Sequence, residues 1–310
     1  MTPMFHPDLS VRVGGIELKN PIIAASGTFG YGIEFEDIVH LDRLGGLVVK
    51  GLSKEPLTGN PPPRLFETAA GMLNAIGLQN IGAPAFLDEK LPALRAKKNV
   101  VVFANVFGYS RPDYEETIEI LNQGEGIAAY ELNVSCPNTA HGGIQFGSDP
   151  RLLDEVVRTA KRITTRPLIV KLSPNVTSIA QMACVAQEAG ADALSLVNTF
   201  LAMAIDPETR RPRIANITAG LSGPAIKPIA LRMVHDAAQA VKIPIIGMGG
   251  ITRASDVIEF MLAGASAVQV GTASYSDPVA TEKLVEELTE SCREHRIEQL
   301  ADLTGGLLTD

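Results

Sequence analysis

The segment ELNVSCPN, residues 131–138, marks a sharp change from an apolar strand to a polar loop. Residues 128–134 predict a short buried strand, because they are mostly apolar and end in a β-branched side chain. Pro137 cannot continue a strand ladder, and glycines 142–143 give the following loop conformational freedom. Most free cysteines are small buried hydrophobes. Cys136, however, lies among polar neighbours at a strand tip, and we therefore expect it to be chemically reactive.

Seven further apolar stretches resemble this strand, and each ends in small or polar residues. The eight predicted strands cover residues 21–26, 46–51, 100–106, 128–134, 168–172, 193–199, 244–249 and 267–271. Helical patterns lie between most of them, at residues 113–123, 149–163, 176–189, 223–241 and 253–263, and a final helix is predicted at 277–296. Apolar strands separated by helices predict a parallel sheet that is covered on both faces.

Eight such units predict an α/β fold of the (β/α)8 TIM-barrel type, formed by residues 1–310 as a single domain. A doubly wound sheet is the alternative, but no Gly-x-Gly-x-x-Gly motif follows the first strand. Residues 9–18 predict an N-terminal β-hairpin that closes the floor of the barrel. Two long excursions, residues 53–87 and 200–222, are expected to form walls at the C-terminal face, and prolines exclude a helix from residues 53–64.

Composition excludes several classes of function. The chain has 310 residues, a net charge of −8 and 45% hydrophobic residues. It lacks the basic clusters of a nucleic-acid-binding protein, a signal-peptide pattern and an apolar run long enough to cross a membrane. We therefore predict a cytoplasmic protein without nucleic-acid or membrane partners. The three cysteines form no C-x-x-C pair, so the chain predicts neither a zinc site nor an iron–sulfur cluster of its own.

The strand tips carry the chemistry. Lys50 and Lys171 each end an apolar strand, and a buried lysine needs an anionic partner, so an anionic ligand is implied twice. Asparagine amides at three other tips can bind the edge of an imide ring. Glycines at the ends of the last two strands, Gly249–Gly250 and Gly271, favour a phosphate site, as is common in barrels. The candidate binding or catalytic residues at the strand tips are Ser26, Lys50, Gly51, Asn105, Asn133, Cys136, Lys171, Asn198, Thr199, Gly249, Gly250, Gly271 and Thr272.

Several of these motifs together resemble one family. They are NVSCPN at 133–138, NAIGL at 74–78, VKG at 49–51, VKLSP at 170–174, and the glycines at 249–250 and 271. The chain resembles the class 1 dihydroorotate dehydrogenases, and more specifically the catalytic subunit of the NAD-linked class 1B type. The resemblance covers residues 11 to 276. It implies oxidation of dihydroorotate to orotate in pyrimidine (UMP) biosynthesis.

The resemblance also implies roles for individual residues. Cys136 would be the general base that removes a proton from dihydroorotate, while a hydride passes to FMN. FMN would contact Ser26, Lys50, Gly51, Asn105, Asn133, Lys171, Val197, Gly223, Gly249, Gly250, Gly271 and Thr272. The substrate would contact Lys50, Asn74, Ala75, Ile76, Gly77, Leu78, Asn133, Asn138, Asn198 and Thr199. No metal is implied.

The loop at residues 52–60 resembles class 1B rather than the fumarate-linked class 1A. Electrons would then reach NAD through a partner subunit carrying FAD and a [2Fe–2S] cluster, in a heterotetramer of two plus two subunits built on a homodimer core. Class 1A and another FMN barrel that acts on pyrimidines are alternatives. A barrel that uses Cys136 as a covalent nucleophile and a non-catalytic phosphate-binding barrel are rivals from other classes.

Overall fold

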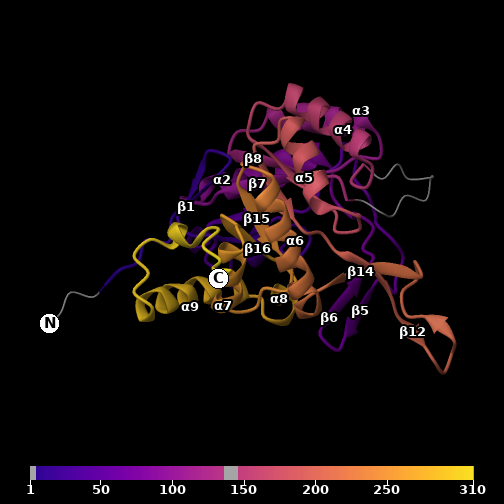
Figure 1. Ribbon diagram of the computed structural model, residues 1–310. Coiled ribbons are helices and arrows are strands. Elements are labelled where there is room, and N and C mark those ends of the chain that lie inside the picture. Colours follow the sequence, from indigo (N-terminus) through magenta and orange to yellow (C-terminus); the bar gives the residue numbers. More distant parts are fainter. Residues whose placement is uncertain (1–4, 136–145, 310) are drawn as a thin grey trace.

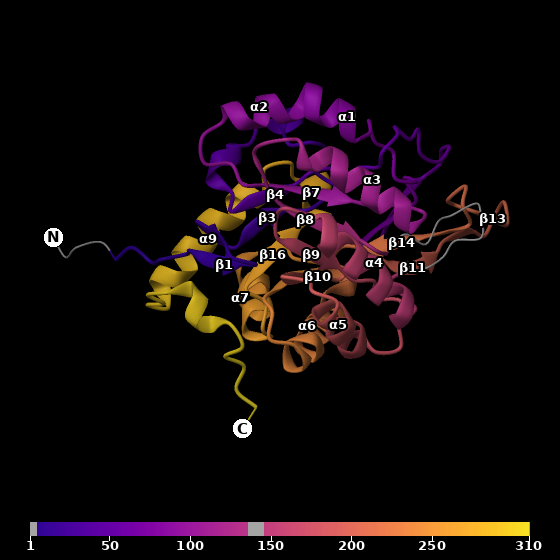
Figure 2. The same ribbon diagram turned by 90° about the horizontal axis from the view of Figure 1, so that it is seen from above.

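Eight parallel strands close into a barrel in the computed structural model, which describes residues 5–135 and 146–309 (Figures 1 and 2). The strands are β3 (Ile22–Ala24), β4 (Gly46–Val48), β7 (Val102–Val106), β8 (Ile127–Asn133), β9 (Leu168–Lys171), β10 (Ala193–Leu196), β15 (Ile245–Met248) and β16 (Ala267–Val270). They follow one another around the barrel in this order, and β16 pairs with β3. The predicted TIM barrel is confirmed.

Burial explains why these segments are strands. Every residue of β9 and β15 is buried, as expected for a parallel sheet covered by helices. The outer helices are α1 (Ala83–Ala85), α2 (Leu91–Ala96), α3 (Arg111–Asn122), α4 (Pro150–Ile163), α5 (Ile179–Glu188), α6 (Lys227–Ala240), α7 (Ala254–Leu262), α8 (Ala273–Ser276) and α9 (Ala280–Glu294). Short helical turns are η1 (Ile33–Phe35), η2 (Leu41–Arg43), η3 (Phe86–Lys90), η4 (Pro224–Ile226) and η5 (Leu300–Leu303).

Capping residues set the start of two helices that the sequence pattern alone placed differently. The helix predicted at 113–123 begins earlier, at Arg111, because Ser110 and Asp113 form a capping box. The helix predicted at 176–189 begins later, because the Ser178 side chain caps the N–H of Gln181. The final predicted helix, 277–296, is shorter and runs only over α9.

The predicted hairpin is present as β1 (Val11–Val13) and β2 (Ile16–Leu18), paired antiparallel. A Cβ added at Gly14 in its turn would lie 3.6 Å from the Cβ of Asp192, just before β10 begins. The hairpin therefore lies at the amino ends of the strands, opposite the face where barrel active sites form.

The two excursions form a second sheet that the sequence pattern did not predict. β5 (Leu65–Thr68) and β6 (Gly71–Asn74) come from the first excursion, and β11 (Phe200–Met203) and β14 (Thr218–Ser222) come from the second. They pair in the order β11-β14-β6-β5, so that segments far apart in sequence lie side by side at the edge of the barrel (Figure 1). A further ribbon, β12 (Ile205–Asp206) with β13 (Arg211–Pro212), extends from this sheet.

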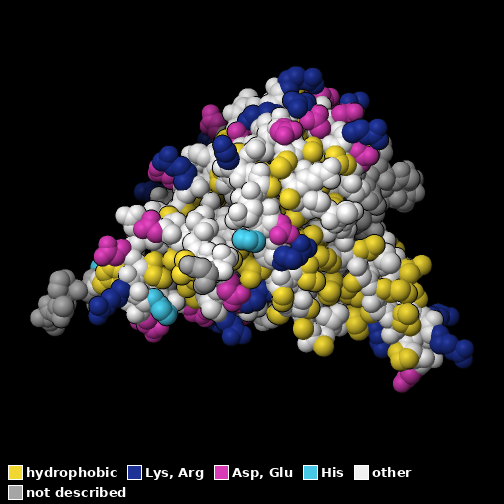
Figure 3. Space-filling view, in the orientation of Figure 1, with side chains coloured by type: hydrophobic (Ala, Val, Ile, Leu, Met, Phe, Trp, Pro, Cys, Tyr) yellow, Lys and Arg dark blue, Asp and Glu magenta, His cyan; other side chains and the backbone are white. Residues whose placement is uncertain are grey.

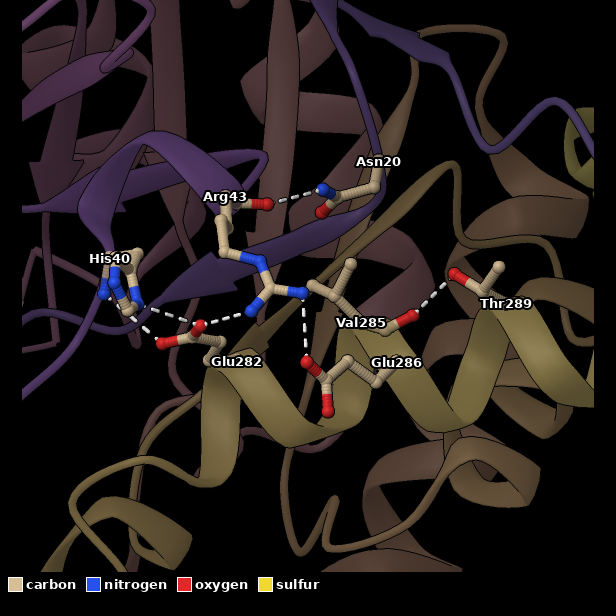
Figure 4. Close-up of polar contacts among 7 residues, drawn as sticks. All are labelled: Asn20, His40, Arg43, Glu282, Val285, Glu286 and Thr289. Carbon is tan, nitrogen blue, oxygen red and sulfur yellow. Dashed lines mark hydrogen bonds and ion pairs between the residues drawn. The ribbon is translucent and has the colours of Figure 1, made fainter.

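Charged side chains attach α9 to the segment after β3. Figure 4 shows Glu282 of α9 accepting hydrogen bonds from the backbone N–H of His40 and the Arg43 guanidinium, while Arg43 also contacts Glu286. Burial acts to raise the pKa of the Glu282 carboxyl, but these contacts outweigh it and the pKa is lowered. Within residues 5–135 and 146–309, no helix combines the length and apolar character needed to cross a bilayer.

Candidate active site

A pocket of about 1000 Å³ opens where the carboxyl ends of the barrel strands meet the second sheet. Nineteen predicted site residues fall in the described part of the chain, and all of them line this pocket. They are Ser26, Lys50, Gly51, Asn74, Ala75, Ile76, Gly77, Leu78, Asn105, Asn133, Lys171, Val197, Asn198, Thr199, Gly223, Gly249, Gly250, Gly271 and Thr272. The other two predicted residues, Cys136 and Asn138, lie outside the described residues. The size suits a ligand larger than a single pyrimidine ring.

Lys50 brings a cation to the pocket. Among the described residues, no carboxylate forms an ion pair with its ammonium group. Burial lowers the pKa of Lys50, and the nearby charge of Arg64 lowers it further. An anionic ligand would relieve both effects, so this lysine fits the predicted anion site.

Lys171 differs from Lys50, and here the sequence-based inference is corrected. Its ammonium group lies 3.6 Å from a carboxylate oxygen of the fully buried Glu131. The buried charge of Lys171 therefore has an anionic partner within the protein, so its burial does not by itself imply an anionic ligand. The side chain still lines the pocket, where it presents a cation to whatever binds.

Two residues that line the pocket, Asn105 and Gln269, each carry a buried amide oxygen that lacks a partner among the described residues. Asn105 Oδ1 and Gln269 Oε1 make no hydrogen bond within the described protein, although both side chains are at least 99% buried and line the pocket. An unsatisfied buried acceptor costs about 1–3 kcal/mol. Both oxygens therefore favour a ligand that carries N–H or O–H donors.

The tip of β8 is fixed by its neighbours just before the cysteine loop. The Asn133 side-chain oxygen accepts from the N–H of Ser135 at 3.2 Å and from the Asn198 amide at 3.4 Å. The Ser135 hydroxyl donates to the carbonyl of Lys171 at 3.2 Å. The chain therefore leaves the barrel at Ser135 from a defined position beside the pocket.

The glycine turns let the backbone approach the pocket closely. Gly250 has a φ of 74°, and a Cβ added there would lie 2.8 Å from the carbonyl oxygen of Gly223. A side chain at this position would therefore clash and be strained. Thr272, after β16, donates its hydroxyl to Ser222 of the second sheet at 2.8 Å, which joins the barrel to the wall.

Some residues that line the pocket were not predicted from the sequence pattern. Gln269 interrupts an otherwise apolar strand, and a buried polar residue of this kind is the signal that could have identified it. Residues 65–72 and Ser222 line the pocket through the second sheet. No local pattern marks them, because their position depends on pairing between the two excursions.

Comparison with known proteins gives consistent results. The family model described as dihydroorotate dehydrogenase matches residues 8–292. A protein of Solibacter usitatus named putative dihydroorotate dehydrogenase A (fumarate) is 62% identical over 301 residues, covering 97% of this chain and 99% of that protein. A protein of Citrifermentans bemidjiense named dihydroorotate dehydrogenase B (NAD(+)), catalytic subunit, is 54% identical over 304 residues, covering 98% and 99%.

A solved structure, DHODH from Eimeria tenella in complex with ferulenol, is similar with a TM-score of 0.82 at 23% identity, covering 99% of this chain and 90% of that one. It supports the fold alone. The family match and the relatives confirm the resemblance drawn from the motifs around residues 133–138 and 74–78. The chain belongs to the dihydroorotate dehydrogenase family.

Proposed function

We propose that this protein oxidises dihydroorotate to orotate, a step of pyrimidine biosynthesis, in a single-domain barrel formed by residues 1–310. The observation that carries the proposal is the family match over nearly the whole chain. The pocket is compatible with it. Orotate is a carboxylate on a ring with imide groups. The pocket offers several amides and a lysine that has no carboxylate partner among the described residues.

Members of this family depend on a flavin, and the pocket residues fit FMN. The unpartnered oxygens of Asn105 and Gln269 can accept from its N–H and O–H groups, and the Gly250 turn lets backbone N–H groups approach a phosphate. The residues that would hold it are Ser26, Lys50, Gly51, Asn105, Asn133, Lys171, Val197, Gly223, Gly249, Gly250, Gly271 and Thr272. When bound, FMN supplies the acceptor for the hydride that dihydroorotate loses.

The substrate would lie against the second sheet and the strand tips. The Lys50 ammonium would bind its carboxylate, because this lysine has no protein carboxylate as a partner in the described residues. The other contacts would come from Asn74, Ala75, Ile76, Gly77, Leu78, Asn133, Asn138, Asn198 and Thr199. Amide groups both donate and accept, which suits alternating carbonyl and N–H groups on a ring edge.

Cys136 is proposed as the general base. It would remove the C5 proton of dihydroorotate, while the hydride leaves from C6, so that the ring gains its double bond. In the sequence Cys136 directly follows Ser135, whose hydroxyl is hydrogen-bonded to the Lys171 carbonyl of β9. A thiol has an ordinary pKa of about 8.5, so the rate should rise with pH until the thiolate forms.

Replacing this thiol tests the proposal. Cys136→Ser should retain bound flavin but lose about 10²–10⁴-fold in the rate of flavin reduction by dihydroorotate, because a serine hydroxyl ionises far less readily than a thiol near neutral pH. Cys184→Ser is the matched control, since that thiol lies on α5 and contacts the carbonyl of Ala240. Unchanged reduction in Cys136→Ser would remove the cysteine from the mechanism.

We further propose NAD as the final acceptor. The loop at 52–60 and the NAD-linked names of relatives near 54% identity support this, whereas the name of the Solibacter relative points to fumarate. Electrons would pass through a partner subunit carrying FAD and a [2Fe–2S] cluster, in a heterotetramer of two plus two subunits. Turnover of the isolated chain with fumarate would contradict this assignment.

An exposed apolar face supports the homodimer core of that assembly. Four apolar side chains in or next to the second sheet and its ribbon are each 49–57% exposed: Leu201, Met203, Ile205 and Ile217. Figure 3 shows hydrophobic side chains gathered over this part of the molecule. Such a surface is typical of a protein interface.

A further inference from the structure

Glu131 lies beneath the pocket, at the centre of the barrel. It is fully buried on β8 and is absent from the residues that line the pocket. Its position is unusual, because a carboxylate is rarely buried completely unless several partners compensate for its lost hydration. The proposed function gives Glu131 no role, since it touches neither the space for FMN nor that for the substrate.

Its partners come from four other strands of the barrel. One carboxylate oxygen accepts from the Asn105 amide at 2.7 Å and lies 3.6 Å from the Lys171 ammonium. The other oxygen accepts from the Ser195 hydroxyl at 2.9 Å and from the Gln269 amide. Three of these four partners line the pocket, and Ser195 does not.

A carboxylate can only accept hydrogen bonds, and this fixes how its partners point. The amides of Asn105 and Gln269 must turn their NH₂ groups toward Glu131, so their oxygens are left for other donors. Neither of these two oxygens has a hydrogen-bond partner in the described part of the chain. The same carboxylate holds the Lys171 ammonium at the pocket floor.

We propose that Glu131 is a positioning residue for flavin binding. Its carboxylate orients Asn105, Gln269 and Lys171 so that the pocket floor presents two acceptors and one cation to the N–H and carbonyl groups of the flavin ring. The inference rests on the proposed function, because it takes the ligand of this floor to be FMN.

Glu131→Gln tests the inference with little change in shape. A glutamine at this position would put its own NH₂ group in place of one carboxylate oxygen, and each of those oxygens faces an amide donor, from Asn105 or from Gln269. Donors then face each other, so one amide must turn over and present NH₂ in place of oxygen to the pocket. Removing the negative charge also leaves the Lys171 ammonium unpaired. We expect the dissociation constant of FMN to rise ten- to a hundredfold, and the visible absorption bands of bound flavin to shift.

Two variants separate positioning from general destabilisation. Ser195→Ala removes a hydrogen bond from the same carboxylate without altering a pocket-lining group, so FMN affinity should stay within about threefold even if thermal stability falls. Glu131→Asp keeps the charge but shortens the side chain by one methylene, so it should retain more affinity than Glu131→Gln. If Glu131→Gln does not fold, Glu131→Asp alone should still bind FMN more weakly than the wild type.

The experiment titrates FMN into apoprotein prepared from each folded variant and follows flavin fluorescence and absorbance. Affinity in Glu131→Gln within threefold of the wild type, or an equal loss in Ser195→Ala, would overturn the inference. Glu131→Gln should weaken FMN binding less when it is added to Lys171→Met than when it is made in the wild type. If the two substitutions weaken FMN binding in a fully additive way, the inference is also overturned. A wild-type protein that binds no FMN would refute the proposed function itself, which is a different result.

Discussion

Lys50 is the residue whose chemistry depends most directly on its surroundings. It reaches the pocket from the end of β4, has no protein carboxylate as a partner within the described chain, and has a pKa lowered first by burial and then by Arg64. A bound carboxylate would stabilise its charged form. The free energy of that pairing should therefore appear in the pH dependence of ligand binding.

Orotate affinity should fall as the pH rises. Below the lowered pKa of Lys50 the side chain is charged and binds the carboxylate, and above it the charge is lost, so weakening begins below the ordinary value of 10.5. Lys50→Met should weaken binding about 10–100-fold at neutral pH, which corresponds to about 1.5–3 kcal/mol for a charged hydrogen bond. It should also flatten the alkaline part of the profile. Calorimetric titration measures both, and an unchanged profile in Lys50→Met would assign the effect to another group.

Individual residues show where prediction from sequence succeeded and failed. Strand-tip reasoning found Lys50 and Asn105, because polar residues that end apolar strands face the open end of a barrel. The same reasoning does not identify Glu131 and Gln269, because they lie within strands whose other residues are mostly apolar. A buried polar residue inside a strand needs partners from neighbouring strands, and these become visible only when the barrel is closed.

At the scale of elements, the order of the eight barrel strands follows from the sequence alone. Each is a short apolar run, and a helix or a long loop separates it from the next. The second sheet could not be predicted in the same way. Its register joins Asn74 to Gly220, and pairing across such a separation depends on the barrel bringing the two excursions together.

The start of α7 illustrates how one side chain organises an element. Asp256, which is 3% exposed, accepts from the N–H groups of Thr252 and Arg253 and from the Lys227 ammonium at 2.7 Å. These contacts fix the turn that follows the glycines at 249–250. Burial acts to raise the pKa of Asp256, but Lys227 and Thr252 outweigh it and the pKa is lowered.

Asp256→Asn should lower the free energy of unfolding by about 1–3 kcal/mol at neutral pH, because it weakens hydrogen bonds to a charged acceptor. A lowered pKa contributes stability above the ordinary value of 3.8, and this contribution is lost as the pH falls through the native pKa. The difference between variant and wild type should therefore narrow in acid.

Urea unfolding at several pH values measures this difference. Asp154→Asn is the matched control, because Asp154 pairs with Arg158 on the solvent side of α4 and should change stability by no more than about 0.5 kcal/mol. Equal effects of the two substitutions would contradict the role assigned to Asp256.

At the scale of the whole molecule, the second sheet both walls the pocket and carries the exposed apolar face. A glutamate at two of its exposed positions, Leu201→Glu with Met203→Glu, should convert the proposed homodimer to monomers, because burying two unpaired carboxylates in an interface is unfavourable. Leu308→Glu is the control, since Leu308 is 85% exposed near the C-terminus and far along the chain from this sheet. Sedimentation velocity distinguishes the two states, and a variant that remains dimeric would place the interface elsewhere.

The central claim is that this barrel holds a flavin which dihydroorotate reduces. The most direct measurement is the visible absorption spectrum of the purified protein without oxygen, before and after adding dihydroorotate. The account predicts flavin bands that bleach within the mixing time or seconds after it, with one orotate formed for each flavin reduced. A protein that binds FMN but does not bleach would contradict the assigned substrate, and a protein that binds no flavin would contradict the assigned chemistry.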